Sequence, residues 1–237
     1  MARRAAIFAC LLIAFAFAAA PAAAQRMGRI VDITGDADIV SLNTGGKLAP
    51  AVGTVIMRDY RVRTGAKSTM EIQLDDGTKV IMRETTVLSV LAVKTREQDP
   101  PARIRLLGGT ARVISASRFR SRALVIKAPT AIVGIMGGRA TDVGMVASAI
   151  DARVVVFKGA IDAASSVERI IKSYAVGKGE EVRIAKNSQP EPPRKVPEKV
   201  FNAWFETYYI DENDAIVRID PNADRSILDS LLRKKRY

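Results

Sequence analysis

The fold class is decided by residues 70–82, which read MEIQLDDGTKVIM. Apolar and polar residues alternate on each side of the central DDG, and this period of two is typical of a half-buried β-strand. Asp76-Gly77 can adopt the positive φ angles that a tight turn between two strands requires. The stretch therefore predicts an antiparallel β-hairpin.

Short runs rich in β-branched residues continue on both sides of this hairpin, separated by turn residues. The runs lie at residues 29–33, 39–42, 85–93, 103–107, 110–115, 123–127, 131–133 and 151–157. No stretch before residue 190 has the length and the 3.6-residue period of a crossover helix. We therefore expect an all-β domain of many short strands over residues 25–187, built as a β-solenoid or a sandwich.

The composition changes after residue 187. Residues 188–197 hold four prolines and predict a semi-rigid, extended linker. Residues 198–237 then place aromatic side chains at helical spacing, so we expect a C-terminal helical appendage. These aromatic residues are Phe201, Trp204, Phe205, Tyr208 and Tyr209. The helix is expected to cap an open edge of the β domain, and docking of a partner or a glycan is the alternative.

Residues 1–24 have the order of a secretory signal peptide. Two arginines precede an apolar run from Ala5 to Ala20, and small residues ending at Ala24 follow it. The run is shorter than the roughly 20 residues that a membrane-spanning helix needs. We expect cleavage between Ala24 and Gln25 and a protein located in the periplasm, with a retained membrane anchor as the alternative.

The composition excludes much of the catalytic repertoire. The 237-residue chain has no histidine, and its one cysteine, Cys10, lies in the expected signal peptide. Ser-His-Asp and Cys-His catalysis and the usual zinc sites therefore cannot be built. Glycines at 134–138 lack the spacing of a phosphate-binding loop. We expect no enzymatic activity and no cofactor.

Acidic residues give little sign of a catalytic or metal site. Neighbouring carboxylates occur at residues 75–76, 180–181 and 211–212. Adjacent residues on a strand point to opposite faces of the sheet, so the first two pairs are not expected to converge as an acid and a base. Asp32, Asp36 and Asp38 lack a complete EF-hand pattern. We therefore expect no metal.

Basic residues are the more informative charges. The formal net charge is +12, and it falls to +10 without the two arginines of the first segment. The densest basic zone is the candidate surface for an anionic ligand or partner, with a solvated face as the alternative. Its residues are Arg112, Arg118, Arg120 and Arg122. Nucleic acid is not expected, because aromatic residues do not interleave with the basic ones. Peripheral membrane contact is possible, and the oligomeric state stays open.

Several stretches, taken in order, resemble the FecR-domain family of bacterial envelope proteins. They carry that family's pattern of glycines, turn residues and short apolar strands at residues 53–78, 107–113, 128–143, 154–161 and 176–182. Within the third stretch, Met136 and Gly138 stand where the family signature usually has Arg and Thr. The resemblance covers roughly residues 30–186.

The resemblance implies an all-β binding or scaffolding module without established enzymatic activity. The family's best-known members are transmembrane anti-sigma regulators that relay iron-siderophore signals. We expect an exported, non-enzymatic scaffold that presents a β-rich surface to an envelope protein or to an anionic polysaccharide or lipid surface. A periplasmic regulator in a FecR-type relay is the first alternative, and a carboxylate-dependent, glycan-acting enzyme is the second.

Overall fold

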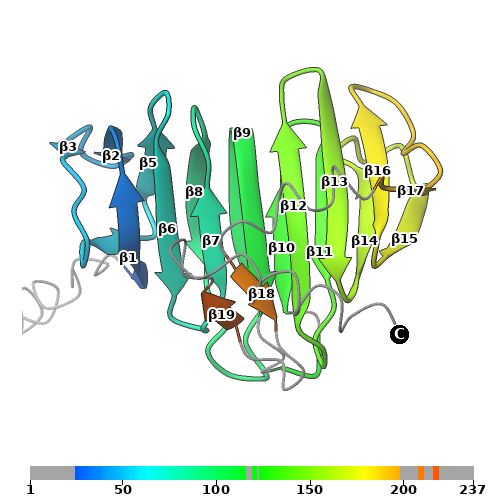
Figure 1. The fold of residues 1–237 in the computed structure, drawn as a ribbon, viewed down its shortest axis with the longest axis horizontal. Coiled ribbons are helices and arrows are strands. Elements are labelled where there is room, and N and C mark those ends of the chain that lie inside the picture. Colours follow the sequence, from blue (N-terminus) through cyan, green and yellow to red (C-terminus); the bar gives the residue numbers. More distant parts are fainter. Residues whose placement is uncertain (1–24, 116–118, 122, 198–207, 211–215, 219–237) are drawn as a thin grey trace, which may run out of the picture.

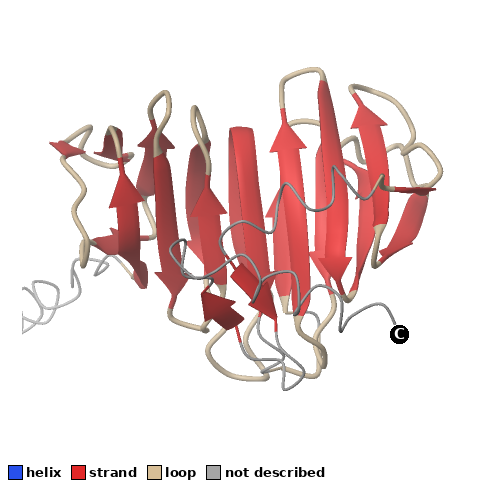
Figure 2. Ribbon diagram, viewed as in Figure 1, coloured by secondary structure: helices blue, strands red, loops and turns tan. Residues whose placement is uncertain are grey.

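The computed structural model describes residues 25–115, 119–121, 123–197, 208–210 and 216–218 (Figure 1). These residues form strands and loops, and no helix occurs among them (Figure 2). The described part of the chain therefore holds no helix long and apolar enough to cross a membrane. The expected all-β fold class is confirmed.

Two sheets of nine strands each make up the fold, and they share the long strand β9. In the first sheet the strands follow the order β4-β1-β6-β7-β9-β12-β13-β16-β17. Their bounds are β4 Val55–Met57, β1 Arg26–Thr34, β6 Thr69–Leu74, β7 Lys79–Met82, β9 Ala102–Ser115, β12 Thr141–Ala147, β13 Asp151–Lys158, β16 Glu180–Ala185 and β17 Arg194–Lys195.

In the second sheet the order is β3-β2-β5-β8-β9-β10-β11-β14-β15. Its other bounds are β3 Lys47–Leu48, β2 Ala37–Ser41, β5 Tyr60–Thr64, β8 Val87–Ala92, β10 Leu124–Lys127, β11 Ala131–Ile135, β14 Ala160–Ser165 and β15 Ser173–Gly177. Among the described strands of the two sheets, every pairing is antiparallel except that of β9 with β10. The chain passes repeatedly between the sheets, and the strands run across the long axis of the molecule and stack side by side along it (Figure 1).

Strand β9 joins the two sheets. Two strands were predicted here, at 103–107 and 110–115, but the chain runs as one strand from Ala102 to Ser115. Its first half pairs with β8 and β10, and its second half pairs with β7 and β12. Gly109 lies between the halves with φ +95°, and a Cβ there would lie 2.5 Å from the backbone of Thr86. Glycine is therefore required where β9 changes sheet.

The predicted hairpin at residues 70–82 is confirmed as β6 and β7. Gln73 pairs with Lys79 and Met70 pairs with Met82. The turn uses Gly77 at φ +88°, whereas Asp76 accepts a 2.8 Å hydrogen bond from the Thr78 backbone N–H.

The main hydrophobic core lies between the two sheets. It is aliphatic, and it combines residues of the first sheet such as Ile72 and Val113 with residues of the second such as Val62 and Ile126, all at most 1% exposed. Burying such a side chain contributes about 1.5–3 kcal/mol. Because buried and outward residues alternate along each strand, both sheets also have an outer face.

The segments after residue 187 differ from expectation. In the predicted linker, β17 pairs with β16, the Glu191 backbone N–H donates to the Arg183 carbonyl, and Pro190 is buried. This segment therefore lies along strand β16 and covers part of its edge.

The C-terminal helical appendage is not supported. Tyr208 and Tyr209, expected on a helix, lie in strand β18, Tyr208–Ile210, which pairs with β19, Ile216–Arg218. Strand formation is favoured here because the run Tyr-Tyr-Ile combines aromatic and β-branched residues. Phe201, Trp204 and Phe205 lie outside the described residues.

Candidate interaction surface

The outer face of the first sheet carries a continuous row of side chains that crosses eight strands. Each member lies opposite the next in the strand register. From β1 to β17 the row reads Asp32, Glu71, Ile81, Arg112, Gly144, Val155, Glu181 and Arg194. Charged groups at both ends thus flank a mostly apolar centre.

The centre of this face is covered although its side chains point away from the main core. Ile114 is 0% exposed, and Val155 and Phe157 are each 2% exposed. Ile114 packs with Ala140 and Ile81 in a small cluster separate from the main core. The first sheet therefore has a second buried layer on its outer face.

A buried ion pair lies in this layer. Arg112 Nε donates to Asp142 Oδ1 at 2.9 Å and Arg112 Nη2 donates to Asp142 Oδ2 at 2.6 Å, so the contact is bidentate. The Arg112 guanidinium also lies over the Phe157 ring, 5.4 Å from its centroid. Arg112 faces Gly144 across the strand pair, and Asp142 lies two residues before Gly144 on the same strand.

This geometry corrects one prediction. Arg112 was expected on a surface that binds an anionic ligand, but it is 3% exposed and its guanidinium is held by Asp142. Strand alternation alone does not show which outward-facing residues are covered. The signal available in the sequence was the acidic Asp142 within the otherwise apolar strand that begins at Thr141.

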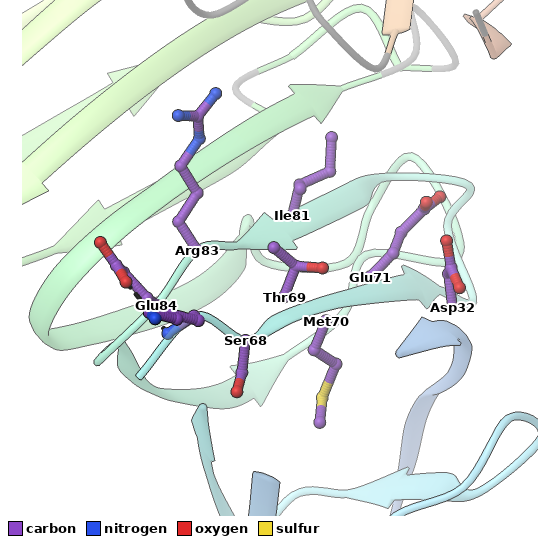
Figure 3. Close-up of a pocket in the computed structure, with 9 residues that line it drawn as sticks. Asp32, Ser68, Thr69, Met70, Glu71, Ile81, Arg83 and Glu84 are labelled. Carbon is purple, nitrogen blue, oxygen red and sulfur yellow. Dashed lines mark hydrogen bonds between the residues drawn. The ribbon is translucent and has the colours of Figure 1, made fainter. Parts of the chain in front are cut away.

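A hollow of about 370 Å³ opens beside this layer, over β6 and β7 (Figure 3). Its lining combines acidic, basic and small polar groups, and Glu71 and Ile81 belong to the row defined above. The residues that line it are Asp32, Lys67, Ser68, Thr69, Met70, Glu71, Ile81, Arg83 and Glu84. Glu71 Oε1 accepts a 3.0 Å contact from Lys79 Nζ.

The other end of the row is an ion-pair network. Glu181 is 6% exposed and accepts from Arg194 at 2.7 Å, with Arg153 at 4.0 Å. Beside it, Arg183 pairs with Asp151 at 3.1 Å. The Ser148 hydroxyl and then Arg183 lower the pKa of Asp151, so this carboxyl is ionised at neutral pH.

Arg120 belongs to a loop cluster away from this face. Its backbone N–H and that of Ser121 donate to the Glu97 carboxylate at 3.1 and 2.9 Å. The Ser121 hydroxyl and these two amides lower the pKa of Glu97. Lys94 Nζ donates to the Asp99 carbonyl at 2.8 Å and lies over the Phe119 ring. The Arg120 side chain is exposed, while Arg118 and Arg122 lie outside the described residues.

The Met136-Gly137-Gly138 corner supports the same loop. A Cβ at Gly137 would lie 2.0 Å from the Ser121 carbonyl oxygen and 2.2 Å from that of Phe119. The Gly138 N–H donates to the Phe119 carbonyl, and Met136 is 48% exposed. The corner therefore acts as a docking point for backbone and not as a phosphate loop.

The carboxylate pairs at residues 75–76 and 180–181 do not converge on a common point, and the pair at residues 211–212 lies outside the described residues. Asp75 pairs with Arg26 at 3.3 Å, whereas Asp76 holds the hairpin turn. Glu180 accepts from the Gly177 N–H, and Glu181 faces the other side of β16. Within the part of the chain that the structure describes, no group of three or more His, Cys, Asp or Glu could hold a metal ion.

Comparison with known proteins gives one family match. The model of the family described as FecR protein matches residues 60–162. Two crystal structures of a proposed anti-sigma factor from Parabacteroides distasonis are similar to the chain, at 12% and 13% identity and TM-scores of 0.48 and 0.46. Each comparison covers 74% of this chain and 91% of the other. No curated protein matches the chain.

Proposed function

The chain carries a FecR domain at residues 60–162, and from this premise we propose that the protein is a non-enzymatic signalling regulator of the bacterial envelope. It acts by binding a protein partner through the exposed part of the first sheet's outer face, around Val146, which is 41% exposed. The sequence predicted a scaffold first and a regulator in a FecR-type relay as the first alternative. The family match supports the regulator better than a purely scaffolding role.

One observation carries the proposal. The matched region begins at β5 and ends within β14, so it contains Arg112, Asp142 and Phe157. The strands that define the family therefore build the buried ion pair and the apolar centre of this face. Val146 lies beside this buried layer on β12 and is exposed, and charged groups lie toward both ends of the row. An exposed apolar residue with polar groups around it suits recognition of a protein, since interfaces combine an apolar centre with a polar rim.

The carboxylate geometry supports a binding role over a glycan-acting enzyme. Paired acids that act on glycosidic bonds must flank one bond, roughly 5–9.5 Å apart. Asp75 and Glu181 are each held by an arginine, and Asp76 is held by a turn amide. Export to the periplasm belongs to the same proposal, and it rests on the signal-peptide order of residues 1–24.

Complementation of a deletion strain tests the function. Val146 lies on the proposed face and is 41% exposed, so V146R should block partner binding without disturbing the core. Ala175, exposed on the second sheet, provides the matched control A175R. The deletion strain should show altered transcription of an envelope regulon, which the wild type and A175R restore and V146R does not.

Two results would contradict this proposal. Unchanged transcription on deletion would exclude signalling and favour a scaffold. Equal restoration by V146R and A175R would remove the first sheet's outer face from the function. Circular dichroism of both variants checks that each is folded.

A further inference from the structure

Six cationic side chains share the outer face of the second sheet. Four of them lie in one row across the strands. In order from β3 to β10, the row reads Lys47, Val40, Arg61, Ser89, Arg105 and Lys127. Arg63 and Arg103 lie two residues away from the row, on opposite sides of it. The row runs from β3 to β10, a span of roughly 24 Å at about 4.8 Å per strand.

These six side chains are exposed. They alternate with core residues such as Val62, Ile104 and Ile126, so they point away from the core. Within the described residues, none of the six has a salt bridge with a carboxylate. The acidic residues on the strands of this face are Asp38, opposite Arg63, and Asp162, on β14.

The cations on the two outer faces therefore differ in whether they pair with carboxylates. On the first sheet's outer face five cations lie beside carboxylates: Lys79, Arg112, Arg153, Arg183 and Arg194. The first sheet also has two directly opposed arginines, Arg153 and Arg183, but these pair with Glu181 and Asp151. On the second sheet, Arg105 and Lys127 lie directly opposite each other, and among the described residues neither has a salt bridge with a carboxylate. Like charges in that position destabilise a sheet. Folding alone would not favour this arrangement, whereas an anionic ligand compensates the repulsion.

We propose that the outer face of the second sheet binds the anionic phospholipid surface of a membrane. The cations are spread in two dimensions over a sheet face and lie on both sides of the row. A plane of phosphate groups can meet all six at once, whereas a single extended polyanion follows one line. The hollow of Figure 3 lies on the first sheet, so it offers no groove for an extended polyanion on the outer face of the second sheet.

Membrane binding through this face would also fix the orientation of the molecule. What that orientation means for signalling rests on the function proposed above. When the second sheet lies on the membrane, the exposed part of the first sheet's outer face around Val146 points away from it and stays accessible to a protein partner. Membrane binding itself depends only on the six cations.

The site is tested by co-sedimentation with lipid vesicles. The protein for this assay is purified from the organism that produces it. The probes are vesicles of phosphatidylethanolamine with phosphatidylglycerol, and neutral phosphatidylcholine vesicles as the comparison. Each basic residue near an anionic surface contributes about a five-fold gain in partitioning, so R105S/K127S should lose about 25-fold. Binding of the wild type should weaken as salt rises.

The matched control R58S/K186S removes two exposed cations outside this row and should bind like the wild type. The variant K127E separates binding from folding. It places a carboxylate opposite Arg105, so it should raise the melting temperature while it weakens vesicle binding.

Equal losses in R105S/K127S and R58S/K186S would overturn the site, since they would reflect net charge alone. Binding to phosphatidylcholine that is insensitive to salt would also overturn it. Retention by a soluble acidic polysaccharide but not by anionic vesicles would assign the face to a glycan instead. Neither variant touches Val146, so failure here leaves the signalling proposal to its own test.

Discussion

Removal of Asp142 tests whether the outer face of the first sheet is a buried layer. In the wild type, the side chains of Arg112 and Asp142 are 4% and 2% exposed and join through two short hydrogen bonds. D142A takes away the bidentate acceptor while the guanidinium stays in a site shielded from water. Loss of one partner from a buried pair costs about 3–5 kcal/mol.

The expected size of the effect distinguishes this pair from a surface pair. Arg183 and Asp151 form a comparable contact, but their side chains are 45% and 35% exposed. The matched variant D151A should therefore lower the free energy of unfolding by at most about 1 kcal/mol. A double replacement R112M/D142L fills the same space with apolar groups and should recover most of the stability that D142A loses.

Urea unfolding followed by circular dichroism measures all three variants. With a slope of about 2 kcal/mol per molar urea, D142A should lower the midpoint by about 2 M and D151A by about 0.5 M or less. Equal small shifts for D142A and D151A would refute the reasoning, because they would mean that water screens both pairs alike. Failure of R112M/D142L to recover stability would show that the layer depends on charge and not on burial.

Three further predictions concern other parts of the fold. G109A should lower the free energy of unfolding by about 1–3 kcal/mol in urea titration, because its Cβ would meet the Thr86 backbone at 2.5 Å and its φ is +95°; an unchanged midpoint would contradict a required glycine. The lowered pKa of Glu97 means that its contribution to stability is complete above the unfolded value near 4.5 and is lost as the pH falls through the folded value. Amide exchange at Ser121 should accelerate on that acidification, and E97Q should abolish the pH dependence. Deletion of residues 198–237 should lower the thermal midpoint if this segment covers the sheet; a stable truncated domain that no longer binds its partner would favour docking instead.

Local sequence pattern predicted the strands well. The hairpin at 70–82 and the strand at Asp151–Phe157 appear at nearly the predicted bounds, because alternation and turn chemistry act over a few residues. The FecR resemblance, stated from motif order, is confirmed at residues 60–162. The same local pattern wrongly predicted two strands in place of β9, with a turn at Gly108-Gly109. Glycine pairs usually mark a turn, but here they lie where one strand passes from the second sheet to the first.

The candidate sites were harder to predict, because they depend on which strands become neighbours. The basic zone around Arg118 was chosen by sequence density, yet the described cations that gather on one face come from β3, β5, β9 and β10. Arg61 and Arg105 are 44 positions apart in the chain and reach one row through Ser89. Sequence spacing cannot show such a row before the register is known.

The sequence by itself determined the strand period, most of the turns, the absence of histidine and of thiol chemistry after Cys10, and the resemblance to the FecR family that is matched at residues 60–162. Only the tertiary structure decided that Arg112 is buried against Asp142 and that the second sheet's outer face collects exposed cations. The physical reason is that alternation assigns a side chain to one of two faces of its strand. Pairing between distant strands then decides what lies beside that side chain and whether water reaches it.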